Sequence, residues 1–448
     1  MLKFGIRLGL CSLLVAAATG CGGVKGNENP DEEEVGAEIM LTEDSMDSIL
    51  KENSELMQKV MQDFAFHVWA KLDADESYVF SPLSVQMLFT MLLNGAEGET
   101  AQEMVKALDL DTAALDMKGY NNIYHHLMEN MPKLDSGVKL NIANAMVVNK
   151  KYPLKKEFVN EAKAYYKAMV ENMDFTRSDN VVAKINGWCD KNTNGLIPQI
   201  IDRVTPDMTA CLMNAVYFKG TWTDPFEKEL TKQRTFTDEK GNRQELEMMA
   251  QRERLRYMEN GRMQCLCLPY GWGNFRMYVL LPKAGYKVAD LVAALNTGQW
   301  TAVKNKMQRR DADVWLPKFE TKYHKQLNEM LKELGMKRAF TQSAEFGGFS
   351  EMPSYISLAQ QDAIIKVYEE GSEAAAVTSV VVACAALEEE EPEPPVVFHA
   401  DHPFIYMIEE RESGAILFMG RYNGQKVRDA RPCVSTGQVK TSYHGVYI

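Results

Sequence analysis

The sequence predicts an α+β fold, and two observations support this prediction. Early in the chain, residues 48–72 place Leu50, Val60 and Phe64 among apolar positions with the spacing of an amphipathic helix. Later segments contain apolar, strand-like runs, such as "TACLMNAVYFKGTW" at residues 209–222. Helices and strands are mixed without the regular alternation of a parallel sheet, and this favours α+β over α/β.

The first half of the chain supplies most of the expected helices. Residues 77–108 indicate a short strand, a helix that begins at Ser81-Pro82, a glycine-rich break and a second helix. Residues 139–150, "KLNIANAMVVNK", are typical of a strand. Residues 181–197 then predict a helix that ends at Asn194-Gly195, because both residues tolerate the backbone that terminates a helix.

The second half supplies most of the expected strands. Residues 262–270 and 275–282 predict two strands joined by a glycine-rich turn. Residues 311–319 predict another strand, followed by a helix over residues 324–336. Residues 396–422 end in a hairpin centred on Ser413-Gly414.

Composition limits the function classes. The 448 residues are 46% hydrophobic and 25% charged, which is ordinary for a globular protein with an ample core. The formal net charge of −12 argues against a nucleic-acid partner. The cysteines of the body are scattered without a CxxC pair, so they predict core thiols rather than a zinc site or a disulfide framework: Cys189, Cys211, Cys265, Cys267, Cys384 and Cys433. No metal or cofactor is expected.

The N-terminus is typical of a targeting segment. Lys3 and Arg7 precede a short apolar stretch, and the small residues before Cys21 resemble the lipobox of bacterial lipoproteins. We therefore expect a signal peptide over residues 1–20, a lipid on Cys21 and a flexible acidic tether over residues 21–44. The protein would be exported and anchored at the bacterial cell envelope, with the outer-membrane surface as one location. The alternative is a plain secretory signal with a coincidental cysteine.

The segment "EEGSEAAAVTSVVVACAALEEEEPEPP", residues 369–395, is unusual for a loop. It opens with charge and glycine, continues through small residues and becomes an apolar β-branched run. Such a run is a good strand former once it is paired. No proline occurs between residues 369 and 391, so every backbone N–H there could join a sheet. The segment therefore has the composition of a buried strand, although charged residues that favour solvent flank it on both sides.

Four further motifs accompany this segment in order and spacing: "FSPLS" at 80–84, "NGAEGETAQEM" at 94–104, "NAVYFKGTW" at 214–222 and "DHPFIYMIEERESGAILFMGR" at 401–421. Together they resemble the serpin family over about residues 45–425. The resemblance implies about nine helices around three β-sheets, with an exposed reactive-centre loop over about residues 369–398 that can insert into the main sheet. Residues 426–448 extend beyond the usual end and have no assigned role.

The resemblance also implies functional residues. The hinge of the loop corresponds to Glu369, Glu370, Gly371, Ser372, Glu373, Ala374, Ala375, Ala376 and Val377. The region where the sheet opens corresponds to Ser81, Ser84, Asn214, Trp222 and Gln361. Family members commonly carry a histidine at the position of Gln361, and glutamine can both donate and accept in its place.

The function implied by the resemblance is suicide-substrate inhibition of a serine endopeptidase, which forms a covalent acyl complex. The scissile bond usually lies fourteen residues past the hinge glycine, which places it at Ala385–Ala386 and favours an elastase-like enzyme. A papain-like cysteine protease and a non-inhibitory binding role are the alternatives within the family. A surface hydrolase or solute-binding lipoprotein is the alternative from another class, although G-x-S-x-G and H-E-x-x-H motifs are absent. We expect a monomer that is not an enzyme and that forms loop–sheet polymers on heating.

Overall fold

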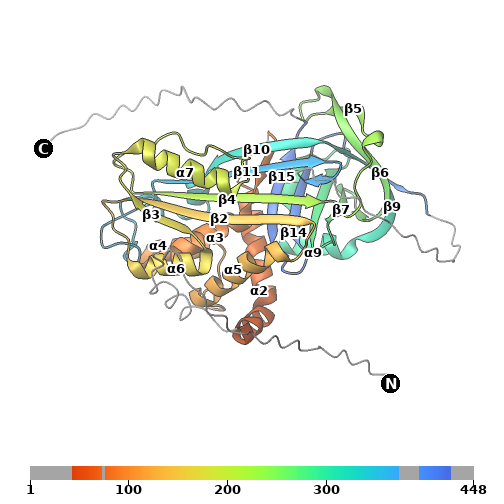
Figure 1. Cartoon of the computed structure of the whole chain (residues 1–448). Helices are drawn as coiled ribbons and strands as arrows, with labels where there is room; N and C mark the ends of the chain where they lie inside the picture. Colours follow the sequence, from red (N-terminus) through yellow and green to blue (C-terminus); the bar gives the residue numbers. More distant parts are fainter. Residues whose placement is uncertain (1–42, 73–75, 373–392, 425–448) are drawn as a thin grey trace, which may run out of the picture.

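The computed structural model describes residues 43–72, 76–372 and 393–424 (Figure 1). Several predicted features lie outside these residues, so their predictions stay open: the signal peptide, Cys21, most of the tether, Glu373, Ala374, Ala375, Ala376, Val377, the Ala385–Ala386 bond and residues 426–448.

The described residues contain nine α-helices, in agreement with the expected number. They are α2 (Glu43–Trp69), α3 (Pro82–Leu93), α4 (Gly98–Ala107), α5 (Met117–Asn130), α6 (Lys156–Tyr166), α7 (Ser178–Asn192), α8 (Val288–Ala294), α9 (Thr297–Lys306) and α10 (Asn328–Glu333). Helix α7 ends where the sequence predicted, because Asn194 and Gly195 both have positive φ.

One helix prediction is too long. We expected a helix over residues 324–336, but the chain stays extended through Gln326, and only Asn328–Glu333 is helical. The reason is tertiary: residues Phe319–Gln326 form a continuous antiparallel ladder with the strand Leu358–Tyr368. Ladder hydrogen bonds and cross-strand contacts override the local helical pattern.

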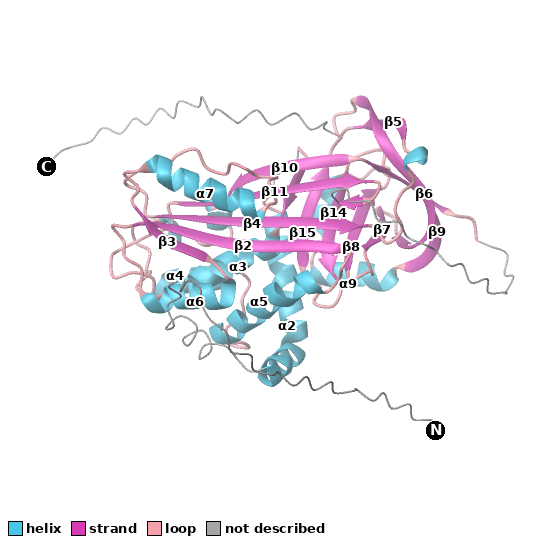
Figure 2. Ribbon diagram, viewed as in Figure 1, coloured by secondary structure: helices cyan, strands magenta, loops and turns pink. Residues whose placement is uncertain are grey.

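The main sheet has six strands in the order β10–β11–β12–β4–β2–β3. Its members are β10 (Phe319–Gln326), β11 (Leu358–Tyr368), β12 (Gly371–Ser372), β4 (Ala210–Thr221), β2 (Val138–Asn149) and β3 (Met169–Met173). Five of these strands have at least five residues, and β12 has two. The long strands run side by side across the molecule (Figure 2).

The other strands form one nine-stranded assembly. They are β1 (Tyr78–Phe80), β5 (Lys232–Thr237), β6 (Arg243–Glu259), β7 (Met263–Tyr270), β8 (Phe275–Pro282), β9 (Gln308–Pro317), β13 (Val396–His399), β14 (Phe404–Glu410) and β15 (Ile416–Tyr422). Strand β6 pairs with β5 and β9 over most of its length and with β7 only over its last four residues. The expected second and third sheets are therefore hydrogen-bonded to each other through β6.

Both faces of the main sheet are covered, which its alternating side chains require. Cys211, Met213 and Ala215 of β4 face α7, which crosses that side of the sheet in Figure 1. Leu212, Val216 and Phe218 belong to the large core on the other face. That core includes eight of the twelve residues of α3, all of them apolar, and every residue of α3 is buried. A helix that is apolar on all sides must be covered on all sides.

The described cysteines agree with the expectation of core thiols. Cys189, Cys211, Cys265 and Cys267 are free and buried. Burial raises the pKa of the Cys211 thiol to about 12, so this group is protonated at neutral pH. Within the described ranges, no helix is both long enough and apolar enough to cross a membrane.

Candidate functional site

The hinge enters the main sheet. Gly371 and Ser372 form β12, which pairs antiparallel with Val367 and Tyr368 of β11 on one side. On the other side it pairs antiparallel with Gly220 and Thr221 of β4. Two residues of the loop therefore already occupy the position of a central strand.

Gly371 is required here for two reasons. Its φ is +143°, a conformation that residues with a side chain rarely adopt. A Cβ atom at this position would lie 2.0 Å from the backbone oxygen of Gly220. The sequence suggested a flexible pivot, and the structure adds a close backbone approach that excludes any side chain.

Ser372 is held by an aromatic cluster that sequence reasoning missed. Its side chain is 1% exposed, and its Oγ lies 2.7 Å from the hydroxyl oxygen of Tyr270. The Tyr270 ring stacks on Trp222 with a centroid distance of 4.3 Å. The Trp222 indole N–H donates to the Tyr368 carbonyl at 3.0 Å. Trp222 is thus part of the hinge support.

The two glutamates before the glycine are fixed by lysines from distant parts of the chain. Glu369 is 4% exposed, accepts a hydrogen bond from Thr231 at 2.9 Å and lies 3.2 Å from the Lys318 ammonium. Glu370 pairs with Lys228, and the hydrogen bond from this lysine lowers the pKa of the Glu370 carboxyl. These side chains line an open cleft of about 450 Å³. No motif in the sequence marked either lysine.

At the end away from β12, the strands β4 and β11 are hydrogen-bonded directly to each other. Residues Leu358–Asp362 of β11 pair in parallel with Cys211–Ala215 of β4, and β12 lies toward the other end of the two strands. The strands that enclose the hinge therefore join directly over five residue pairs. Any further entry of the loop has to break this ladder.

Gln361 is a residue of β11 within the closed ladder. Its side chain contacts both the start of α3 and the neighbouring strand β4. Its Oε1 accepts the Ser81 N–H at 2.8 Å, and its Nε2 lies 3.0 Å from the hydroxyl oxygen of Ser84. The same Nε2 lies 3.3 Å from the Asn214 Oδ1 on β4. All four residues are buried. The structure brings Ser81, Ser84, Asn214 and Gln361 together as a polar cluster, whereas Trp222 lies at the hinge end.

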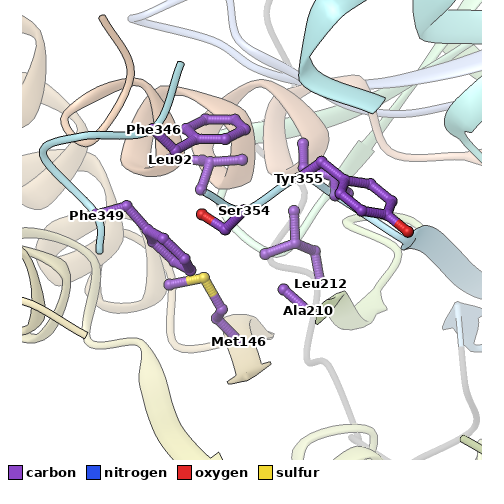
Figure 3. Close-up of a pocket in the computed structure, with 9 residues that line it drawn as sticks. Leu92, Met146, Ala210, Leu212, Phe346, Phe349, Ser354 and Tyr355 are labelled. Atoms are coloured by element: carbon purple, nitrogen blue, oxygen red, sulfur yellow. The ribbon is translucent and has the colours of Figure 1, made fainter. Parts of the chain in front are cut away.

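A small apolar cavity borders the closed end. It has a volume of about 10 Å³ and is lined by residues that include Leu92, Met146, Leu212 and Phe349 (Figure 3). The Ser354 hydroxyl lies among these apolar groups and has no hydrogen-bond partner within the described residues. Packing at this end of the ladder is therefore imperfect.

The downstream end of the loop is anchored in the other sheet. Strand β13 pairs in parallel with β9, from Val396 opposite Ala312 to His399 opposite Trp315. The His399 and Trp315 rings stack with a centroid distance of 3.5 Å, and Glu393 pairs with Arg310 at 2.9 Å. The two ends of the expected reactive loop are thus held by two different sheets.

Comparisons with known proteins agree with this architecture. The family model described as Serpin (serine protease inhibitor) matches residues 59–424. An uncharacterized serpin-like protein of Thermococcus kodakarensis is 32% identical over 84% of this chain and 88% of its own length. Human Serpin B3 is 29% identical over 84% of this chain and all of its own length.

Solved structures show the same fold. The thermophilic serpin tengpin in its native state has a TM-score of 0.75 and 29% identity, over 83% of this chain and 95% of tengpin. Human thyroxine-binding globulin in complex with its hormone also has a TM-score of 0.75, with 25% identity, over 82% of this chain and 98% of the globulin. With the family model matching most of the described residues, the chain belongs to the serpin family.

Proposed function

We propose that this chain is a suicide-substrate inhibitor of elastase-like serine endopeptidases, and that loop insertion traps the acyl-enzyme. The observation that carries the proposal is β12. Its two residues are seated between β4 and β11, and the residues that follow in the sequence, Glu373 to Val377, are mostly small. The strand that would insert is therefore continuous with one that is already paired.

The chemistry is that of an interrupted hydrolysis. The protease nucleophile attacks the carbonyl carbon of Ala385, the peptide bond to Ala386 breaks, and the amine leaves with the downstream fragment. The upstream segment then extends β12 through the β4–β11 ladder and carries the esterified protease with it. About a dozen new backbone hydrogen bonds, each worth about 1 kcal/mol net, make insertion downhill. The chain is consumed in this reaction and is not a catalyst.

Specificity rests on the residues around the bond. No Lys or Arg occurs between Lys366 and Arg411, so a trypsin-like pocket has no cation to bind. Ala385 suits a shallow apolar pocket. The four glutamates at residues 388–391 favour encounter with proteases whose cleft is basic, in a salt-dependent way. A Glu-specific enzyme cutting after Glu388 is an alternative that would lengthen the inserted strand by three residues.

Two other functions stay open within the family. A papain-like cysteine protease forms a thioester acyl-enzyme that could be trapped in the same way. A non-inhibitory binding role is the second alternative, because thyroxine-binding globulin shares this fold and is named for its hormone. The small hinge residues favour the inhibitory role, since a bulky hinge residue would have to enter a packed sheet.

A protease panel tests the proposal directly. The full chain is incubated with elastase-like, trypsin-like, Glu-specific and papain-like enzymes, and the products are separated by denaturing electrophoresis. We expect a denaturation-resistant complex with the elastase-like enzyme and a released fragment whose mass begins at Ala386 or within one or two residues of it. Covalent trapping of trypsin, or a fragment beginning beyond Glu391, would contradict the assigned bond.

The membrane anchor is a separate proposal and rests on the sequence alone. If Cys21 carries lipid, Cys21→Ala will move the protein from the membrane fraction to the soluble fraction. Cys11→Ala is the matched control, because Cys11 lies within the expected signal peptide and its loss leaves the acceptor intact. A wild-type protein that is already soluble, or one cleaved away from Cys21, would disprove the anchor.

A further inference from the structure

Four arginines gather on the outer face of β6 and β9. Alternate residues of a strand share a face, so Arg252, Arg254 and Arg256 of β6 point the same way. The antiparallel register puts Arg309 of β9 directly opposite Arg256, so it lies on this face too. All four residues are exposed. We call this set the arginine face, and β6 and β9 lie together at one end of the molecule (Figure 1).

The arginine face is only partly balanced by carboxylates of the facing strand. Within the part of the chain that the structure describes, none of the four arginines lies within 4.0 Å of a carboxylate in an ion pair. Asp311 and Asp313 lie opposite Arg254 and Arg252, but Asp313 contacts the His399 ring at 3.3 Å instead. Arg256 and Arg309 are like charges on opposite strands, an arrangement that costs stability. The opposed aspartates give Arg252 and Arg254 a favourable cross-strand neighbour, but they leave Arg256 and Arg309 as an unbalanced excess of positive charge in a chain of net charge −12.

The arginine face lies beside the downstream anchor of the loop. Val397 of β13 lies opposite Asp313, on the same face as Arg252, and Glu393, four residues earlier, pairs with Arg310 on the other face of β9. Val397 is 53% exposed and adds an apolar contact there. Ala385 is only eight residues before Glu393, which is at most about 28 Å of extended chain. A protease bound at the expected bond would therefore reach this surface.

We propose that the arginine face is a secondary contact surface for the target protease and binds an acidic patch beside that enzyme's active-site cleft. This inference rests on the proposed inhibitory function and narrows its partner. The glutamates at residues 388–391 lie nearer the bond and meet the cleft itself, whereas the arginines meet its rim. The target protease then combines a basic primed-side cleft with an acidic rim. Such charge complementarity raises the association rate and depends on salt.

The experiment compares variants against a pair of elastase-like proteases, one with acidic and one with basic residues around the cleft. The first variant is Arg252→Ala with Arg254→Ala. The second is Arg309→Glu, which places a carboxylate opposite Arg256 and so favours the sheet while reversing charge. The control is Arg243→Ala, because Arg243 is exposed on the same strand but at its other end.

Two readouts separate this inference from the proposed function. Association rate constants for trapping are measured from low to physiological salt. Binding is also measured with proteases whose nucleophile is replaced by alanine, and this readout needs no trapping. We expect both arginine variants to lose about tenfold or more in rate and affinity toward the acidic-rimmed enzyme at low salt. The stoichiometry of inhibition and the Arg243→Ala control should stay unchanged.

Each other outcome has a defined meaning. Equal losses toward both proteases, or no loss, would overturn the contact surface while leaving the inhibitory function intact. If no protease is trapped, but the inactive enzyme still binds with an affinity that depends on the arginines, only the inhibitory function is overturned. A third outcome is that a sulfated polysaccharide retains the wild type but not the variants, while the substitutions leave protease binding unchanged. That outcome would show that the arginine face does not bind the protease. If replacing the glutamates at 388–391 by glutamine strengthens binding only when the arginines are present, the arginines hold the chain's own acidic run, and the inference falls.

Discussion

At the scale of single residues, the hinge combines one position that allows no side chain with one that allows only a small one. Gly371 contacts the β4 backbone, and Ser372 fits under Tyr270 with its hydroxyl satisfied. Both residues are buried in the uncut protein. A larger residue at position 372 would therefore destabilise the uncut protein as well as the form in which the strand has extended.

The first prediction concerns Ser372. Ser372→Arg should convert the protein from inhibitor to substrate, because position 372 is already buried between β4 and β11, where an unpaired guanidinium costs several kcal/mol (~3 or more) and so drives β12, the start of the inserting strand, out of the sheet. Ser372→Ala is the control, since it keeps the small volume and loses only the bond to Tyr270. The stoichiometry of inhibition and the yield of stable complex are the measurements. If Ser372→Arg traps protease as efficiently as Ser372→Ala, insertion does not begin at this residue.

A second residue-scale prediction concerns pH. His324 and Asp362 lie opposite each other on β10 and β11, and the hydrogen bond that the protonated His324 ring donates to the Asp362 carboxylate raises the pKa of His324 above its usual 6.5. The folded state therefore holds this proton more tightly than the unfolded state. The resulting stability is complete below pH 6.5 and is lost as the pH rises through the folded pKa. Burial also raises the pKa of the Asp362 carboxyl.

The measurement is the melting temperature of the wild type and His324→Gln between pH 6 and about pH 8. The wild type should lose a small amount of stability across this interval, and the variant should be flat. The effect is small because the His324 side chain is 57% exposed and solvent screens the pair. A wild type that becomes more stable as the pH rises, with a flat variant, would mean that the sign assigned to the pair is wrong.

At the scale of elements, the proposed mechanism requires the closed ladder between β4 and β11 to open before the loop can insert. The Gln361 side chain joins these strands to the start of α3, together with Asn214, whose amide donates to the Ser84 carbonyl. Gln361→Leu would leave the Ser81 N–H without its acceptor, at a cost of about 1–3 kcal/mol. We therefore expect lower stability toward denaturant and faster spontaneous loss of inhibitory activity at constant temperature.

Gln360→Leu is the matched control for this prediction. Gln360 is buried on the same strand, but its amide donates to the Ile200 carbonyl rather than across the ladder to α3. Both variants should lose stability on denaturant unfolding, but only Gln361→Leu should speed the spontaneous loss of activity. Equal inactivation rates for the two variants would show that the polar cluster does not control opening.

Sequence reasoning worked best where local pattern and tertiary context agree. The end of α7 follows from Asn194 and Gly195, which tolerate the positive φ that terminates a helix, and the strand β4 follows from a long apolar run rich in strand formers. It failed at residues 324–326, where a helical pattern is drawn into the ladder with β11. It also missed Tyr270, Lys228 and Lys318, because these residues reach the hinge from separate strands and loops. Contacts of that kind leave no local signal in a single sequence.

At the scale of the whole molecule, one central strand position of the main sheet is only partly filled. Five long strands of the main sheet are complete, and the sixth position holds only Gly371 and Ser372. Filling it costs the five residue pairs between β4 and β11, and the gain is a full central strand with two partners. Under the proposed mechanism, the native state is metastable relative to an inserted one. The same open position could accept a neighbour's loop, and heating would then favour head-to-tail polymers.

The last prediction follows from this metastability. A protease that nicks the loop without being trapped frees the upstream segment, which can then enter its own sheet. The nicked protein should melt at a markedly higher temperature than the intact one, because a strand with about a dozen ladder bonds at about 1 kcal/mol each is added to the core. Thermal melts before and after nicking measure this, and nicked Ser372→Arg is the control that should gain little. A wild type whose melting temperature does not change on nicking would favour a non-inhibitory role, since the loop would then be cut without being driven into the sheet.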